Sequence, residues 1–495
     1  MKIKTISLSL LLLLPSYSFG YASCQCDPCS DDDYTAQSFM FTKPIMDNLP
    51  AHNSAWHSIV HQPEGDKCSS LQIFGIFQQS MEHAPNARYF LFDHKTCLKV
   101  VGDTILESHP YTTRDIRAEW FGLPPDFSGG FSICPKQRKM GVLFEYNQKL
   151  RNFFESSLFE NYWISVSAPL VSVENNLNLK QFDIQNPGTG SGPRDILDAL
   201  CQDEWMYGKL CTCPRSDLQL AYIKLKLGST YMSENNFQLA YYSQLLLSTA
   251  PRDCGKYMFD AVVGTNGHHG LGTGVNFQIV INRENPKYDV CIFADLEHIY
   301  LFRLKQMRTL DIKGKPWSRY MLFNQKDRGP DLNLAGVNVL TREVVARPDS
   351  MVDFTFGCRV KTASRLEVEV GYGIWGHGDE CLELVCPFPE IYGIAGEKSG
   401  NSPTTASTST IGTRETNDVD ENNAGVFTPV LQEDLCLKYQ GNRSAINHRV
   451  HLALSAVHAG ENVDGTLSAG VFYEIPQRNS ALKVWGLWGK VAASF

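Results

Sequence analysis

Residues 365–374 read Arg-Leu-Glu-Val-Glu-Val-Gly-Tyr-Gly-Ile, and this stretch decides the fold. In an extended chain successive side chains point to opposite faces. Leu366, Val368 and Val370 therefore share one face, while the two glutamates between them share the other. One face of this strand suits an apolar environment, and the other face suits water.

The same two-residue period recurs along the chain. In residues 447–458, Val450, Leu452 and Leu454 alternate with polar side chains, and residues 465–476 repeat the pattern. Alternation combined with β-branched and aromatic residues is typical of strands. On these grounds we predict twelve strands, at residues 70–80, 131–148, 161–173, 217–230, 236–249, 270–283, 287–304, 350–361, 364–376, 447–458, 465–476 and 482–495.

Two architectures produce such strands: a soluble sandwich with an apolar core, and a membrane barrel with apolar faces turned to lipid. The connections favour the barrel, because long and short connections alternate until the last hairpin. Residues 377–446 form one long connection and residues 362–363 one short turn. A membrane barrel has short periplasmic turns at one rim and long extracellular loops at the other. We therefore expect an all-β fold, a single antiparallel up-and-down transmembrane β-barrel of about 12 strands, within a range of 10 to 14.

The first residues have the pattern of a secretory signal peptide. Lys2 and Lys4 precede an apolar run at residues 8–14, and small residues follow near position 20. We expect cleavage after residue 20, or as late as residue 23; a lipoprotein-type cut before Cys24 is the alternative. No later window has the ~18–20 consecutive apolar residues that a membrane-spanning helix needs.

The domain organisation follows from these boundaries. Residues 1–20 are the signal peptide, and residues 70–495 form the barrel. Residues 21–69 are either a periplasmic arm or a plug packed inside the barrel, since they hold enough apolar residues for the second role. Residues 397–423 are rich in Ser, Thr, Asn, Asp and Gly, so we expect a disordered loop there.

Charge and cysteines restrict the function. Removing the two leader lysines takes the formal net charge from −8 to −10, and the basic residues are scattered, so nucleic-acid binding is not expected. The 15 cysteines suit an oxidising compartment, and their odd number leaves at least one without an intramolecular partner. No motif has convincing metal-ligand spacing, and we interpret His268-His269 as hydrated loop residues. The disulfide candidates are Cys201, Cys211, Cys213, Cys254, Cys381, Cys386 and Cys436.

The chain ends with residues 484–495, Val-Trp-Gly-Leu-Trp-Gly-Lys-Val-Ala-Ala-Ser-Phe. This end resembles the closing strand of Gram-negative outer-membrane β-barrel proteins of the porin type, without indicating a subfamily. The resemblance implies that the barrel-assembly machinery recognises Phe495, helped by Val491 and Ala493. Ala493 departs from the pattern, because a second aromatic residue is common there. The resemblance also implies location in the outer membrane of a Gram-negative-type bacterium.

If the apolar faces meet lipid, the opposite faces line a lumen. Charged residues in a narrow pore set ion selectivity. Alternatively, these charges only stabilise the wall as solvated or paired residues. The pore-lining candidates are Asp289, Asp295, Glu297, Arg359, Lys361, Arg365, Glu367, Glu369, Arg449, Glu474 and Lys490.

We therefore expect a passive outer-membrane channel for ions or small solutes, without a cofactor and without enzymatic activity. Its partners would be membrane lipid, the barrel-assembly machinery and the solute. The sequence leaves open whether the chain forms a homo-oligomer. One alternative is a structural or adhesive surface barrel cross-linked through its cysteines. Another is a barrel hydrolase, although no Ser, His and carboxylate grouping stands out by spacing.

Overall fold

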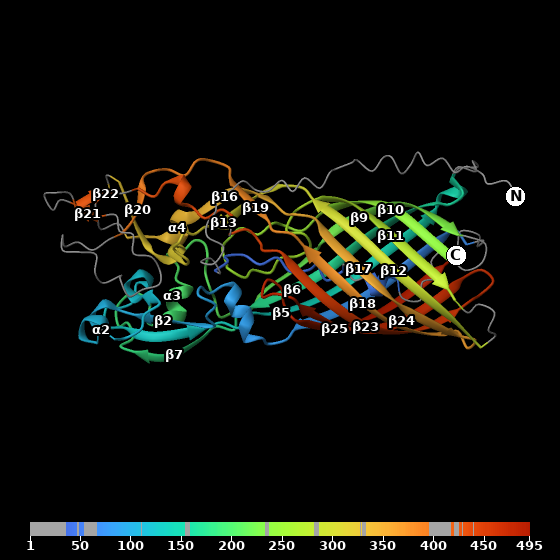
Figure 1. Cartoon of the computed structure of the whole chain (residues 1–495), viewed down its shortest axis with the longest axis horizontal. Helices are drawn as coiled ribbons and strands as arrows, with labels where there is room; N and C mark the ends of the chain where they lie inside the picture. The colour runs from blue at the N-terminus through green and yellow to red at the C-terminus, as the bar shows by residue number, and fades with distance from the viewer. Residues whose placement is uncertain are drawn as a thin grey trace.

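The structure is a computed structural model. It describes residues 36–46, 49–53, 67–109, 111–153, 159–232, 237–281, 287–326, 328, 333–395, 417–419, 425–427, 429–438 and 440–495. Two bodies follow one another along the long axis, a β-barrel and a second body that we call the cap (Figure 1). The predicted signal peptide lies outside the described residues.

The barrel is a closed antiparallel cylinder of twelve strands, as predicted. Each strand pairs with its neighbours in order, and the pairing of β1 with both β5 and β25 closes the wall. The wall consists of β1 (Ser69–Ser80), β5 (Lys136–Lys149), β6 (Tyr162–Asn176), β9 (Tyr222–Met232), β10 (Phe237–Ser248), β11 (Gly270–Val280), β12 (Tyr288–Leu301), β17 (Met351–Thr362), β18 (Leu366–His377), β23 (Ala445–His458), β24 (Asp464–Pro476) and β25 (Val484–Ser494). β8 (Arg215–Leu220) leads into β9 and pairs with the end of β6.

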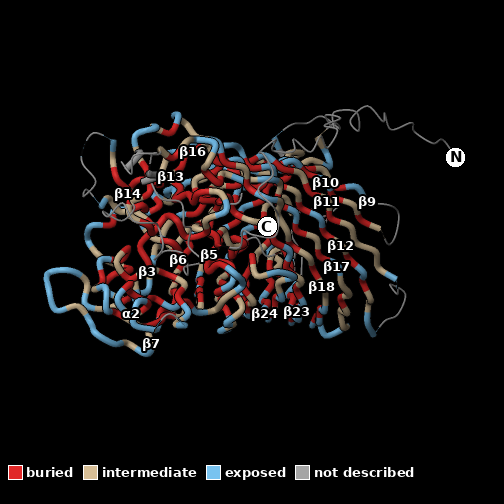
Figure 2. Tube along the Cα trace, turned by 60° about the vertical axis from the view of Figure 1, so that its left-hand side comes forward, coloured by how far each residue is buried: buried red, intermediate tan, exposed pale blue. Residues whose placement is uncertain are grey.

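The two faces of the wall have opposite chemistry. On β18, Val368 and Val370 are 42% and 57% exposed, whereas Glu367 and Glu369 are 4% and 2% exposed. The same alternation of buried and exposed positions runs along the wall strands (Figure 2). Apolar residues outside and charged residues inside are the reverse of a soluble protein, and this is the distribution that lipid requires. The sealed cylinder excludes the two stacked sheets of a soluble sandwich.

Aromatic side chains fill the interior beside inward glycines. A Cβ on Gly470 would lie 2.5 Å from the indole of Trp488, which is buried on the neighbouring strand β25. A side chain at position 470 would therefore displace the indole or the backbone. An inward glycine at this position therefore makes room for the indole inside the barrel.

We predict that Gly470→Val destabilises the barrel by about 1–3 kcal/mol, the usual cost of overpacking a well-packed interior. The measurement is the temperature at which the folded barrel loses its faster migration on gels. Gly489→Ala is the matched control, because a Cβ there meets its nearest atom at 4.0 Å. Equal midpoints for the two variants would contradict the packing.

The cap is formed by the long connections, which we expected to be loops. Its strands form small sheets, β3-β2-β4-β7, β13-β16-β19 and β15-β14-β20, and β21 pairs with β22. The strands are β2 (Cys97–Val101), β3 (Ile116–Arg117), β4 (Ser128–Ser132), β7 (Lys180–Gln185), β13 (Leu304–Thr309), β14 (Leu322–Gln325), β15 (Leu334–Ala335), β16 (Thr341–Arg347), β19 (Cys381–Leu384), β20 (Tyr392–Ile394), β21 (Asn417–Val419) and β22 (Gly425–Phe427). The helices are α2 (Asp103–Ser108), α3 (Ile196–Leu200) and α4 (Gly336–Leu340), with 3-10 turns at Ala84–Tyr89, Ala118–Phe121, Ser318–Tyr320 and Gln432–Asp434; a further 3-10 turn, Leu150–Asn152, follows β5 at the opposite rim of the barrel.

The cap has an aromatic core of its own. Trp317 is fully buried, and its indole N–H donates to the carbonyl oxygen of Phe90 at 2.7 Å. Its ring contacts those of Phe92, Phe131 and Tyr320. These rings come from two connections, residues 81–135 and 302–350, and Tyr320 also contacts Trp205 of a third. The connections are therefore held together as one folded body rather than as separate loops.

Most of the expected disordered loop, residues 397–423, lies outside the described residues; within it, β21 pairs with residues 425–427. Among the described residues, no helix is long and apolar enough to cross a bilayer.

Candidate lumenal site

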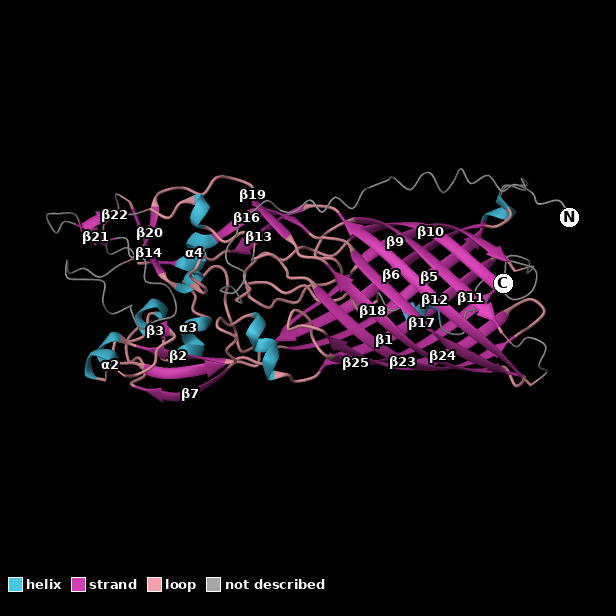
Figure 3. Ribbon diagram, in the orientation of Figure 1, coloured by secondary structure: helices cyan, strands magenta, loops and turns pink. Residues whose placement is uncertain are grey.

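A segment near the N-terminus runs through the interior of the barrel. We call residues 36–46 and 49–53 the lumenal segment; it includes helix α1 (Leu49–Asn53), drawn as a short cyan helix within the barrel outline in Figure 3. Ala36 accepts a hydrogen bond from Arg319 in the cap, whereas α1 contacts β17 and β25 of the wall. The segment thus leads from the cap into the barrel.

Near the cap end of the barrel, Lys43 sits in a buried charge cluster. Its ammonium donates to Glu474 Oε1 at 2.9 Å and lies 3.5 Å from Asp353 Oδ2. Arg449 donates to Asp353 Oδ1 at 2.9 Å and lies 3.6 Å from Glu474 Oε1. All four side chains are at most 7% exposed. Two cations face two carboxylates, so the buried charges balance, as burial requires.

Toward the other end of the barrel, His52 forms a second set of contacts. Its Nδ1 is 3.2 Å from Glu145 Oε2, and its Nε2 is 3.1 Å from the carbonyl oxygen of Met46. Both partners are acceptors, so the imidazole ring of His52 is placed to donate to either of them. The ammonium of Lys490 donates to the carbonyl oxygen of His52 at 3.0 Å. The wall therefore binds both the side chain and the backbone of the segment.

Lys139, another wall residue, adds contacts between these two clusters. Its ammonium donates to Thr42 Oγ1 at 2.7 Å and to the carbonyl oxygen of Lys43 at 2.9 Å. A Cβ on Gly141 would lie 2.8 Å from the sulfur of Met46, so the segment approaches the wall backbone closely there. Polar bonds at both ends and apolar packing in between hold the segment.

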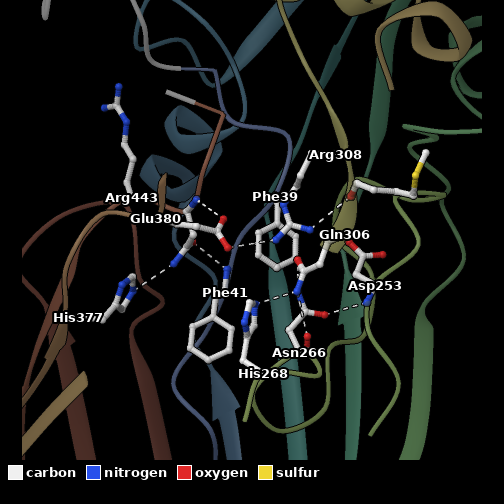
Figure 4. A network of polar contacts seen from close by, with 12 residues as sticks. Phe39, Phe41, Asp253, Asn266, His268, Gln306, Arg308, His377, Glu380 and Arg443 are labelled. Atoms are coloured by element: carbon white, nitrogen blue, oxygen red, sulfur yellow. Dashed lines mark hydrogen bonds and ion pairs between the residues drawn. The ribbon is translucent and has the colours of Figure 1, made fainter. Parts of the chain in front are cut away.

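The cap contacts the lumenal segment at Phe39 (Figure 4). The guanidinium of Arg308 lies over the Phe39 ring, 3.8 Å from its centroid, and donates to Glu380 Oε1 at 3.4 Å. Tyr89 donates its hydroxyl proton to the carbonyl oxygen of Phe39 at 3.0 Å. Burial raises the pKa of Tyr89, so the hydroxyl stays a donor at neutral pH.

Phe41 is bound through Asn442. Its backbone N–H donates to Asn442 Oδ1 at 2.9 Å, and the backbone N–H of Asn442 donates to Glu380 Oε2 at 3.0 Å. Phe39 and Phe41 border a small pocket that His268 and His377 also line. These contacts connect the segment, the cap and the rim of the barrel.

His268 has one fixed tautomer in this junction. Its Nδ1 lies 2.7 Å from the carbonyl oxygen of Phe302 and must donate; its Nε2 lies 2.8 Å from Gln306 Nε2 and must accept. Gln306 cannot turn its amide around, because its Oε1 accepts from Asn266 at 3.1 Å. The side chain is 3% exposed, so the prediction of a hydrated loop residue was wrong. Burial lowers the pKa of His268.

We predict that acid weakens this junction through His268. Because the pKa of the folded state is lowered, the unfolded chain binds the proton more readily, and stability falls as pH drops below about 6.5. The slope is at most about 1.4 kcal/mol per pH unit. Glu380 opposes the shift, whereas Arg308 and His269 reinforce it.

The measurement for this prediction is the thermal unfolding midpoint from pH 5 to pH 8. His268→Asn should flatten the pH dependence, while His458→Asn, which changes an exposed histidine, should keep it. The assignment fails if both variants keep the slope of the unmodified protein.

Most predicted pore-lining residues lie on the inner wall. Asp353 and Glu145 share that face and were missed, although Asp353 has the same parity along its strand as Arg359. The buried inner-face residues from the prediction are Asp295, Glu297, Arg359, Glu367, Glu369, Arg449, Glu474 and Lys490.

Many of these inward charges are paired with one another. Arg359 donates to Glu369 at 2.7 Å, and Glu297 accepts from Lys224 at 3.1 Å. Asp289 and Lys361 are only partly buried, at the strand ends away from the cap. Arg365 is exposed in the turn before β18 with a φ of 64°, so the strand prediction placed it wrongly on the inner wall.

The cysteine predictions have a mixed outcome. Cys201 and Cys211 form a disulfide in the cap, and Cys381 is also disulfide-bonded. Cys213, Cys254 and Cys386 are exposed with free thiols. Cys436 is buried.

The C-terminal residues lie where the wall closes. The backbone of Phe495 pairs with Ser69, and Val491 is 60% exposed on the outer face, while Ala493 is partly buried beside it. Recognition by the assembly machinery stays a prediction.

Together, the sealed wall and its internal segment define a β-barrel of the outer-membrane type with an occupied lumen. No family model matches the sequence, and no curated protein matches it. Among solved structures, the chain is similar to an outer-membrane channel from Pseudomonas putida F1, at 8% identity over 87% of this chain and 97% of that one, with a TM-score of 0.38.

Two other solved structures are similar at the same level. One is a FadL homologue from Pseudomonas aeruginosa, at 8% identity over 93% of this chain and 96% of that one, with a TM-score of 0.29. The other is the translocator domain of the autotransporter NalP from Neisseria meningitidis, at 7% identity over 87% and 89%, with a TM-score of 0.30. Because these identities and TM-scores are low, the assignment of the fold depends only on the strand pairing of this chain.

Proposed function

We propose that this chain is a channel of the Gram-negative outer membrane that passes ions or small solutes when the lumenal segment moves. One observation carries the proposal: the segment occupies the interior of a sealed barrel whose inner wall is charged. An inner wall of this kind can be hydrated when the segment leaves. The outer apolar face supports the membrane location.

The contacts of the segment suit a part that moves. Lys139 and Lys490 bind its backbone oxygens, and a hydrogen bond to a charged group contributes a net ~1.5–3 kcal/mol because water replaces it on release. No covalent bond joins the described part of the segment to the wall. Gating of this kind needs neither a cofactor nor a catalytic step, and we propose that the protein is not an enzyme.

Conductance in planar bilayers tests this function. We expect small or rare current steps from the unmodified protein and a higher open probability for Lys43→Met/Lys139→Met. Losing contacts worth about 1.4 kcal/mol would raise the open population about tenfold. Lys136→Met is the control, since Lys136 pairs with Glu82 on the surface. Correctly inserted barrels without conductance or solute uptake, in either form, would rule the channel out.

The folded cap favours a second candidate, a structural or adhesive surface protein. Its aromatic core and its Cys201–Cys211 disulfide make it a rigid body rather than a set of loops. Oligomers that disappear on gels with reductant would support this role.

A further inference from the structure

We propose that Asp353 and Glu474 form a binding site for a primary ammonium group, which Lys43 occupies as an internal ligand. The site would take amine-bearing solutes when the lumenal segment withdraws. Its role in transport rests on the proposed channel function, whereas the binding site itself does not.

The first argument is the occupant that the structure contains. The Lys43 ammonium is the terminal group of an alkylamine, and it reaches the carboxylates from the lumen rather than from the wall. Its closest contact is 2.9 Å, a charge-assisted hydrogen bond of ordinary length. The wall therefore already binds an alkylammonium group.

The second argument is the charge that remains when Lys43 leaves. Of the cations in the described residues, Asp353 and Glu474 would then share only the guanidinium of Arg449, which leaves one negative charge without compensation. Arg449 cannot follow the segment, because it also donates to Thr355 Oγ1 at 2.6 Å. A buried charge without a partner costs several kcal/mol, so the vacated position favours a cation.

The third argument favours an ammonium over other cations. An ammonium group has three donors on a compact head, and two of its acceptors are the carboxylates. Asn447, 4% exposed, donates to Glu474 Oε2 at 3.5 Å, and its own Oδ1 has no partner among the described residues. This oxygen supplies a further acceptor beside Glu474.

Farther from the cap, the wall repeats the same chemistry. The His52 ring lies 3.2 Å from Glu145 Oε2, so a second basic side chain of the segment faces a second wall carboxylate. A cation that passes the Lys43 position would next meet Glu145. The lumenal segment thus marks a path for cations with two carboxylate positions.

Chemical rescue tests the site with the full-length protein in detergent. Lys43→Ala removes the alkylammonium side chain, and n-butylammonium chloride supplies it again. We expect the variant to have a lower thermal unfolding midpoint, and butylammonium to restore it saturably, because a ligand that binds only the folded state stabilises it. Tetramethylammonium chloride, which has no N–H donor, should need at least about tenfold higher concentration, the ratio that corresponds to about 1.4 kcal/mol.

Three further results decide the proposal. Rescue should disappear in Lys43→Ala/Asp353→Asn/Glu474→Gln, and the surface variant Lys136→Ala should show none. Equal rescue by both amine salts, or no rescue by butylammonium, would overturn the site. If Lys43→Ala does not fold, Lys43→Met keeps the volume: its reversal potential in a KCl gradient should shift toward cation preference, and an unshifted potential overturns the proposal.

The two proposals fail separately. Rescue of the midpoint without any conductance would leave the ammonium site standing and remove the channel. Conductance without rescue, and without block of the Lys43→Ala current by butylammonium, would leave the channel standing and remove the site.

Discussion

Arg319→Met should destabilise the cap by about 3–5 kcal/mol, the usual cost of removing one partner from a buried ion pair. Arg319 and Asp311 are fully buried and 2.8 Å apart. Methionine keeps most of the volume but leaves the Asp311 carboxylate with only uncharged donors, such as Gln440 at 3.2 Å. Arg319 also donates to the carbonyl oxygen of Ala36, so the variant loosens the start of the lumenal segment as well.

Unfolding of the cap can be followed through the fluorescence of buried tryptophans such as Trp317, while the gel shift reports the barrel. Burial raises the pKa of Asp311 even beside Arg319, and losing the cation would raise it further. The deficit should therefore be largest at neutral pH and shrink in acid, where the carboxyl group is protonated. Arg319→Met/Asp311→Asn should recover part of the loss, because it removes the unpaired charge.

The control is a pair of the same type on the surface of the cap. Arg347 and Glu383 are 2.7 Å apart, but their side chains are 44% and 55% exposed. Arg347→Met should cost less than about 1 kcal/mol. If both arginine variants lose the same stability, burial does not set the strength of the Arg319 contact.

The sequence predicted the barrel because lipid and water enforce the two-residue period. Val368 and Glu369 are neighbours with opposite environments, and Leu452 and His451 are another such pair. All twelve predicted segments correspond to wall strands. In a soluble protein, a strand can depart from the alternation of apolar and polar residues more often. A barrel wall is one strand layer thick and has hydrocarbon on one side, so each strand must keep the alternation.

The cap could not be predicted in this way. Its helices α3 and α4 have five residues each, too few for a helical period to be recognised. Its core joins Phe131, Trp205 and Trp317 from separate connections through Tyr320 and Trp317, and local sequence does not report such contacts.

The candidate site was predicted only in part for a similar reason. Strand parity identified Arg449 and Glu474, and the same parity could have identified Asp353. Lys43, however, lies outside any strand and is separated from Glu474 by 431 positions. Sequence indicated that residues 21–69 could pack inside the barrel or remain outside, but it gave no partner for a particular lysine.

Leu452→Arg should cost about 2–4 kcal/mol, the effect of an arginine near the middle of a lipid-facing barrel wall. Leu452 lies midway along β23 and is 46% exposed. Its cross-strand neighbours Val370 and Val471 are 57% and 53% exposed on the same outer face. These two neighbours carry no carboxylate that could pair with an introduced arginine. The guanidinium must therefore reach the membrane interface or draw water into the bilayer.

The free energy of unfolding from phospholipid vesicles, measured in urea, gives the size of this effect. Tyr111→Arg is the matched control, because Tyr111 is 99% exposed in the cap and should tolerate the charge with no change beyond about 0.5 kcal/mol. An arginine at position 452 is harmless only if water covers the outer face. If the Leu452→Arg protein folded and stayed soluble without detergent, the outer face would not be covered by lipid. The membrane location, and the channel function that depends on it, would then be wrong.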